Sequence, residues 1–136
     1  MSAGFLLDTN VVSEPLKPKP SDALMARLKK HENELCIASI VWHELLFGCC
    51  LLPKSKKRSV IEDYLSAIDW VIMPYDAAAA DWHARERARL TQLGKAPSFV
   101  DGQIAAIAAT QNLVLVTFNV RHFAPFQGLT VVDWRE

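Results

Sequence analysis

The chain has 136 residues, 51% of them hydrophobic, and its 15 Lys and Arg residues balance its 15 Asp and Glu residues. This length and apolar content predict one compact domain over residues 1–136, and they exclude a disordered or fibrous chain. A net charge of zero provides no overall field that would draw the protein onto nucleic acid or an anionic membrane. A polyanionic partner must therefore be held by a local basic patch or through a metal ion.

In chain order, short apolar runs alternate with segments of helical periodicity. Ser21, Ser39 and Ser98 stand where helix N-caps are expected. On the long helix, Asp81 and Arg85 have the spacing of a helical ion pair. We predict a strand at 4–7, a helix at 21–30, a strand at 35–38, helices at 40–50 and 54–67, a strand at 70–73, helices at 77–93 and 98–111, and strands at 113–116 and 130–132.

This alternation predicts an α/β fold, in which helices cover a mostly parallel sheet on both faces. The segment 102–120 carries no charge and has the length of a membrane span, but polar residues such as Gln111 and Asn112 interrupt it. We therefore expect a buried helix followed by a buried strand, and no membrane association.

The cysteines and the N-terminal segment predict a cytoplasmic location. Cys36, Cys49 and Cys50 are odd in number and lack the Cys-x-x-Cys spacing of zinc and redox sites. We expect all three to be buried free thiols in a reducing compartment. The first residues have no basic region, and their apolar stretch ends at Asp8, unlike a signal peptide.

Three acidic residues lie in apolar surroundings. Asp8 directly follows the first strand, Glu44 lies within an apolar helix, and Asp101 shares a helix face with apolar residues. Two carboxylates about 4 Å apart repel by ~4 kcal/mol at an effective dielectric constant of 20, so a cluster of three requires a cation. All-oxygen ligands favour Mg²⁺ or Mn²⁺ over Zn²⁺.

Each polar residue of this set also has a structural interpretation. Asp101 fits the capping box that begins at Ser98, Asp8 fits a turn or helix cap, and Glu44 fits a solvated helix rim. Asn119 fits the cap of a short turn at 120–124. A capping role and a role in metal binding are compatible.

The chain contains four sequence blocks: LLDTNVVSE at 6–14, ELLFG at 44–48, DGQIAAIA at 101–108 and VTFNVRHF at 116–123. In this order and at these separations, they resemble the signature blocks of PIN-domain proteins. The likeness is strongest to VapC-type toxins of bacterial toxin–antitoxin pairs, including the FitB-like branch. The segment from Gly128 to Trp134 resembles the last strand and terminal tryptophan of that family.

The resemblance implies a five-stranded sheet of order 3-2-1-4-5 and a Mg²⁺- or Mn²⁺-dependent endoribonuclease in which water is the nucleophile. Asp8 and Asp101 match the metal-binding aspartates, and Glu44 matches an acid that binds the metal directly or through water. Thr117 and Asn119 match the block that completes the pocket, with Thr9 as a supporting hydroxyl.

One departure concerns the number of acids in the site. Many relatives have an acid at the position of Asn119 or His122, and this chain has neither. Only three acids are therefore carried over, and whether a second metal ion binds is left open.

The same resemblance predicts which molecules the protein binds. It implies an RNA substrate, a small VapB-type antitoxin and a homodimer. Arg121, beside the fourth block, is the best candidate for phosphate contact, ahead of basic runs at 54–58 and 85–95 that are also typical of solvated helices. Apolar residues of the 40–52 region either line a groove for the antitoxin or lie in the core: Trp42, Phe47, Leu51 and Leu52.

Two other functions remain as alternatives. The first is a PIN nuclease of RNA processing or of structured DNA. The second is a PIN interaction module without catalysis, suggested by the missing fourth acid.

Overall fold

The computed structural model describes residues 4–136, so the first three residues of the predicted domain and N-terminal segment lie outside the described part. Five strands form one sheet of order β3-β2-β1-β4-β5, in which every pair of neighbours is parallel. The expected order 3-2-1-4-5 is therefore confirmed. The strands are β1 (Phe5–Leu7), β2 (Leu35–Ala38), β3 (Val71–Met73), β4 (Val114–Val116) and β5 (Val131–Val132).

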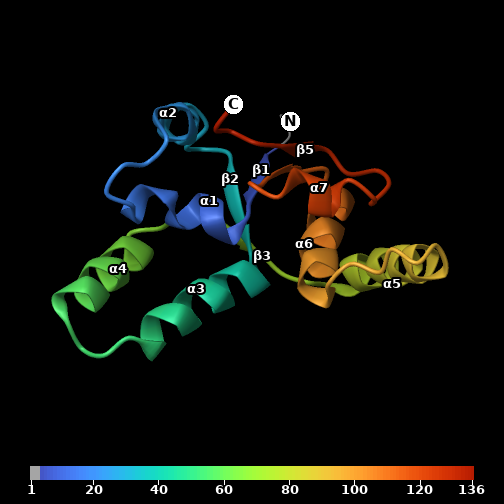
Figure 1. The fold of residues 1–136 in the computed structure, drawn as a ribbon, viewed down its shortest axis with the longest axis horizontal. Helices are drawn as coiled ribbons and strands as arrows, with labels where there is room; N and C mark the ends of the chain where they lie inside the picture. The colour runs from blue at the N-terminus through green and yellow to red at the C-terminus, as the bar shows by residue number, and fades with distance from the viewer. Residues whose placement is uncertain (1–3) are drawn as a thin grey trace.

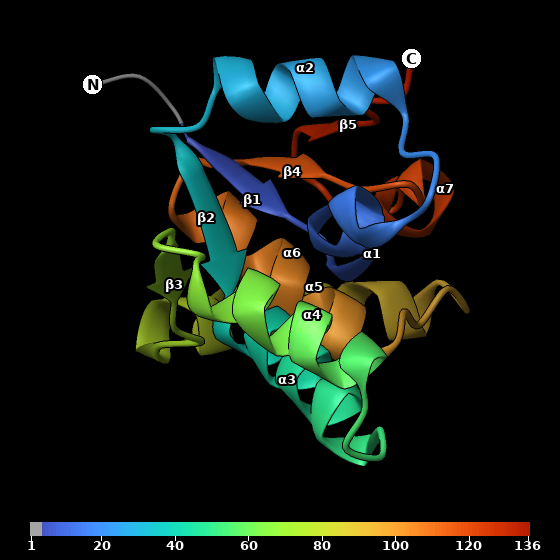
Figure 2. The same cartoon turned by 90° about the vertical axis from the view of Figure 1, so that its left-hand side faces the viewer.

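Helices cover both faces of this sheet. Figure 1 shows α1, α2 and α4 on one side of the central strands and α5 and α6 on the other, and Figure 2 shows α3 and α4 below the ends of β1 and β2. The helices are α1 (Thr9–Ser13), which continues into the short 3₁₀ turn η1 (Glu14–Leu16), α2 (Asp22–Lys30), α3 (Ser39–Leu51), α4 (Lys56–Ser66), α5 (Ala77–Gln92), α6 (Phe99–Thr110) and α7 (Val120–Phe123).

Serine caps begin three of these helices. The side-chain oxygens of Ser21, Ser55 and Ser98 accept hydrogen bonds from the backbone N–H groups three residues later, at 3.3, 3.2 and 3.1 Å. The predicted cap at Ser39 is wrong, because β2 passes directly into α3 at Ala38 and Ser39 is already helical. The predicted ion pair between Asp81 and Arg85 is present, at 3.2 Å.

The core lies between the central strands and the helices that pack on them. Leu6, Leu7, Ile37, Leu115 and Val116 of the strands are fully buried. The charge-free segment contributes the buried face of α6 and then β4, as predicted. No helix within residues 4–136 is both long enough and apolar enough to span a bilayer.

The cysteines and the apolar side chains of α3 differ from the expected burial. Cys49 is buried, but Cys36 is only partly buried and Cys50 is exposed. Adjacent residues of a helix point in different directions, so the Cys49 and Cys50 thiols cannot share one environment. The core interpretation is wrong for Phe47 and Leu51, which are 52% and 68% exposed.

Glu86 joins α5 to the loop that follows α7. Its carboxylate accepts hydrogen bonds from the Arg89 guanidinium at 2.8 and 2.9 Å and from the Gln127 backbone N–H at 3.0 Å. Arg89 also donates to the Pro125 carbonyl at 2.9 Å. The hydrogen bonds from Arg89 hold the pKa of the buried Glu86 carboxyl below its usual value. Arg89 is therefore a structural residue.

Glu86→Gln is expected to lower the free energy of unfolding by about 1–3 kcal/mol at neutral pH, because Arg89 loses its charged acceptor. Since the pKa of Glu86 is lowered on folding, its contribution is complete above the pKa of the unfolded carboxyl and is lost as the pH falls through the folded pKa. Urea unfolding should therefore show a difference in the free energy of unfolding between the wild type and Glu86→Gln that becomes smaller below about pH 4. A difference in the free energy of unfolding that stays constant with pH would contradict a stabilising role for the ionised Glu86 carboxylate.

Candidate metal centre

A buried carboxylate lies where the two central strands β1 and β4 end. Leu7 of β1 is in register with Val116 of β4, and the Asp8 backbone N–H continues the ladder by donating to the Val116 carbonyl at 2.9 Å. The parallel register therefore brings the two residues that follow these strands, Asp8 and Thr117, to the same edge of the sheet. This is the edge at which open parallel sheets bind ligands.

Both oxygens of Asp8 are hydrogen-bonded. The Thr117 hydroxyl donates to Oδ2 at 2.7 Å, and the Thr9 backbone N–H donates to Oδ1 at 2.8 Å. Thr117 is fully buried, and its hydroxyl oxygen in turn accepts the Asn119 N–H at 3.1 Å. Asp8 thus caps α1, as one interpretation of the sequence predicted, while Thr117 fixes its rotamer.

The ionised form of Asp8 is unfavourable in this environment. Asp8 is 8% exposed, and burial raises the pKa of its carboxyl above the usual value. The hydrogen bonds from Thr117 and Thr9 oppose that rise, whereas the nearby charge of Asp101 adds to it. Asp8 and Asp101 are therefore close enough to repel, and a cation between them would stabilise both charges.

Asp101 reaches the site from the first turn of α6. Its backbone N–H donates to the Ser98 side chain, so half of the predicted capping box is present. The next residue, Gly102, lies against the buried His83 of α5, and a Cβ at this position would come within 2.1 Å of His83 Nε2. The absence of a side chain at Gly102 therefore allows α6 to approach α5 and determines where Asp101 lies.

His83 and Tyr75 are site-supporting residues that the sequence reasoning missed. The Tyr75 hydroxyl and His83 Nδ1 are 2.8 Å apart, and His83 Nε2 is buried with no hydrogen-bond partner among residues 4–136. Burial, helped by the charge of Arg87, lowers the pKa of His83, so the imidazole is neutral. The available signal was a glycine inside a helix immediately after a functional acid.

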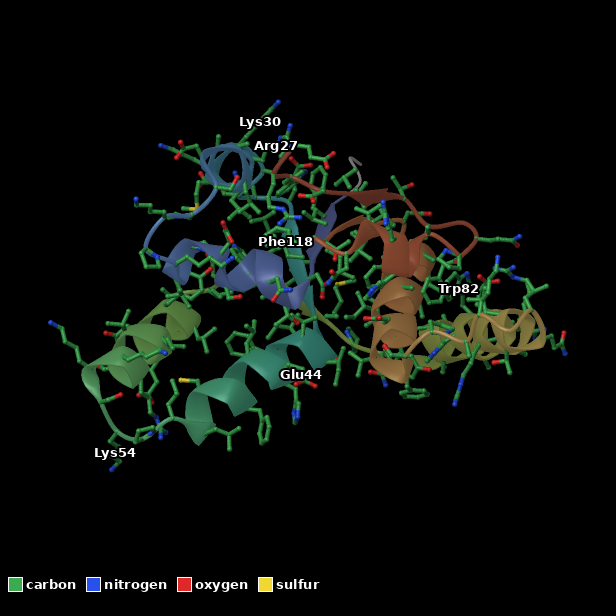
Figure 3. All side chains as sticks on the ribbon, in the orientation of Figure 1. Arg27, Lys30, Glu44, Lys54, Trp82 and Phe118 are labelled. Carbon is green, nitrogen blue, oxygen red and sulfur yellow. The ribbon has the colours of Figure 1, made fainter. Side chains whose placement is uncertain are left out.

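The other predicted site residues are further from the buried centre. Glu44 is exposed on α3, on the side where that helix faces α6 (Figure 3). Asn119 is exposed, and its side chain does not cap α7. The expected cluster of three acids is not formed, because no three His, Cys, Asp or Glu side chains within residues 4–136 gather at metal-binding distance. Glu44 extends from α3, and its side chain is exposed.

The predicted phosphate contact and basic runs have different environments. Arg121 is exposed on α7, beside Asn119. In the basic runs, Arg58 donates to the Leu52 carbonyl at 2.9 Å, and Arg85 and Arg89 pair with acids of their own helix. These three arginines are therefore engaged within the protein.

The donor set suits a hard divalent cation. Asp8 is a buried carboxylate whose charge is opposed by that of Asp101, and the Thr117 hydroxyl adds an oxygen atom in contact with Asp8. Magnesium in proteins commonly uses one or two carboxylates and keeps several waters, so two acids are sufficient for one ion. No thiol belongs to this group, which disfavours a structural zinc site.

The fold and this edge of the sheet define a class of proteins, and sequence comparison identifies it. The PIN domain model matches residues 5–126, and the chain belongs to the PIN domain family. It is 35% identical to the tRNA(fMet)-specific endonuclease VapC of Shigella flexneri over 132 residues, covering 96% of this chain and 97% of that protein. It is 34% identical to Toxin FitB of Neisseria gonorrhoeae over 138 residues, covering 97% and 99%.

Solved structures agree with this assignment. The crystal structure of FitAcB from Neisseria gonorrhoeae superposes with a TM-score of 0.85 and 30% identity, covering 96% of this chain and 97% of that one. DNA-bound VapBC from Salmonella typhimurium gives a TM-score of 0.81 and 29% identity, covering 98% and 99%. The predicted resemblance to VapC-type proteins and their FitB-like branch is therefore confirmed.

Gly102→Ala is expected to destabilise the protein by about 1–3 kcal/mol, because the new methyl group collides with His83. Gly48, inside α3, is the matched control, since an added Cβ there meets nothing within 4 Å. Gly48→Ala should stabilise the protein by about 0.5–1 kcal/mol through helix propensity. Thermal and urea unfolding measure both, and equal effects of the two substitutions would contradict the proposed packing constraint at Gly102.

Proposed function

We propose that this protein is a Mg²⁺- or Mn²⁺-dependent endoribonuclease that acts as the toxin of a VapBC-type toxin–antitoxin pair. The observation that carries the proposal is the buried Asp8 carboxylate, fixed by Thr117 and close to Asp101 at the carboxyl edge of a PIN-family sheet. Relatives over nearly the whole chain are named VapC ribonucleases, and structural neighbours are VapBC and FitAB complexes.

The residues of this chain have distinct parts in the proposed hydrolysis. Asp8 and Asp101 would hold the divalent ion, which when bound supplies Lewis-acid polarisation of the scissile phosphate and of an attacking water. Thr117 keeps Asp8 in one rotamer, and the Thr9 N–H satisfies the other carboxylate oxygen. Glu44 and Asn119, both exposed at the rim, would orient water through their side-chain oxygens, and Arg121 would contact a substrate phosphate.

The partner site proposed for the antitoxin lies between α3 and α4. A cavity of about 410 Å³ there is lined by Trp42 and Leu46 of α3, by Leu65 of α4 and by Ile68, which follows α4. Together with the exposed Phe47 and Leu51, these side chains form an apolar surface of the kind that receives an amphipathic segment of another protein. A homodimer remains a prediction.

Asp8→Asn and Asp101→Asn are each expected to reduce RNA cleavage with Mn²⁺ by at least about 100-fold, because each removes a charge that would hold the ion. Asp81→Asn is the control, since Asp81 is an exposed carboxylate on α5 paired with Arg85. Sequencing of RNA 5′ ends after brief expression measures activity and target together. Full activity of the Asp101→Asn protein would refute the proposed site.

Binding of Mn²⁺ should stabilise the folded protein. At 100 times its dissociation constant, the ion is expected to add ~2.7 kcal/mol to the free energy of unfolding. The melting temperature should therefore rise with Mn²⁺ in the wild type and in Asp81→Asn, and rise much less in Asp8→Asn. If no concentration of Mn²⁺ shifts the wild type and no RNA is cleaved, the protein is the non-catalytic interaction module considered above.

A further inference from the structure

Phe118 lies between the proposed metal centre and the C-terminal segment. It directly follows Thr117, and its ring is partly exposed. The Arg135 guanidinium carbon lies 3.9 Å from the ring centroid, and the Lys17 ammonium lies 5.9 Å from it. An aromatic ring with a guanidinium stacked on it therefore adjoins the residues proposed to cut the substrate.

The Arg135 guanidinium is held in place on this ring. The Asp133 carboxylate accepts from Arg135 Nη2 at 2.7 Å and from Nε at 3.1 Å, while the Asp133 side chain itself is 9% exposed. Between these two residues, the buried Trp134 packs against Phe5 and His31, with ring centroids 4.9 and 5.3 Å apart. The Arg135 side chain is nevertheless 44% exposed, so a flat, fixed cation faces solvent.

A cavity adjoins this platform. It measures about 350 Å³ and is lined by Phe118, Asn119, Arg121, His122 and Arg135, among others. It shares Val120, Asp133 and Glu136 with a second cavity of about 520 Å³ that reaches α2. Figure 3 shows Arg27 and Lys30 of α2 at the top of the view, above Phe118.

The charges along these two cavities favour a polyanion. Four cations line them, Arg27, Lys30, Arg121 and Arg135, against the two acids Asp133 and Glu136. Asp133 is already bound to Arg135, whose hydrogen bonds hold the pKa of that carboxyl below its usual value. The excess positive charge is local, because the whole chain is neutral.

We propose that the Arg135 guanidinium, supported by Phe118, is a stacking platform for a base of single-stranded RNA, and that Arg121 contacts the adjoining phosphate. Proteins bind single strands by combining a basic groove with planar side chains on which bases stack. These planar groups are aromatic rings or arginine guanidinium groups. This inference rests on the proposed ribonuclease function and names how its substrate is held. Paired RNA would not fit, since its bases are already stacked on one another.

The test is equilibrium binding of a labelled single-stranded RNA of about 12 nucleotides, with a chelator present so that the strand is not cut. A strand of equal length and charge whose sugars carry no bases is measured in parallel. Arg135→Ala is expected to weaken binding of the normal strand by about 10-fold or more, and binding of the abasic strand by about threefold at most. Arg135→Lys, which keeps the charge and loses the plane, should behave like Arg135→Ala on the normal strand.

Two controls separate stacking from charge and from folding. Lys29→Ala removes a cation from α2 that does not line either cavity and should leave both affinities unchanged. Phe118→Leu removes the support without touching the Asp133 pair, and it provides the readout if Arg135→Ala lowers the melting temperature. If Arg135→Ala lowers the affinity for both strands equally, Arg135 acts only through its charge and the stacking proposal is wrong. The proposal is also wrong if Arg135→Lys and Phe118→Leu bind the normal strand as tightly as the wild type does.

Failure of this inference is distinguishable from failure of the proposed function. Asp101→Asn should abolish cleavage with Mn²⁺ while binding the normal strand at least as well as the wild type in chelator, because it removes a negative charge near the strand. If the wild type cleaves RNA and substitutions of Arg135 do not change RNA binding, only the stacking proposal is wrong. A wild type that cuts no RNA with Mn²⁺ would overturn the function.

Discussion

Asp8 is a carboxylate with 8% exposure at the end of a central strand, and most of the site is arranged around the cost of its charge. Burial raises its pKa, and Asp101 raises it further. Among residues 4–136, the Thr117 hydroxyl and the Thr9 N–H compensate for this cost by donating hydrogen bonds to the carboxylate. A carboxylate in this condition either takes up a proton or receives a cation, and the second outcome makes it useful for phosphodiester chemistry.

Strand pairing and helix packing place the elements around Asp8. The parallel register of β1 and β4 carries Thr117 to Asp8, and the contact of Gly102 with His83 sets α6, and therefore Asp101, against α5. The charges that would meet RNA lie elsewhere, along α7, the C-terminal segment and α2. The chain has zero net charge, yet the acids Asp8 and Asp101 and the cations along the two cavities occupy different places in the fold.

The sequence alone predicted much of the fold and several residues of the candidate site. The apolar runs predicted all five strands because parallel strands buried on both faces are short and continuously hydrophobic. The acids Asp8 and Asp101 were recognisable because ionised groups are rare next to such runs. Strand order came from the family resemblance, since periodicity does not contain it. The exposure of Glu44 could not be predicted from sequence, because an apolar helix sequence does not show which side faces solvent.

The sequence by itself determined the α/β class, the strand positions and the identity of the acids at the strand ends, since these depend on local hydrophobicity and on residue type. Only the tertiary structure decided that Thr117 is hydrogen-bonded to Asp8, that Arg89 donates to the Pro125 carbonyl, and that Arg135 lies on Phe118. Such contacts join residues far apart in the chain, and their geometry follows from helix packing and strand register. Local patterns of sequence carry no record of either.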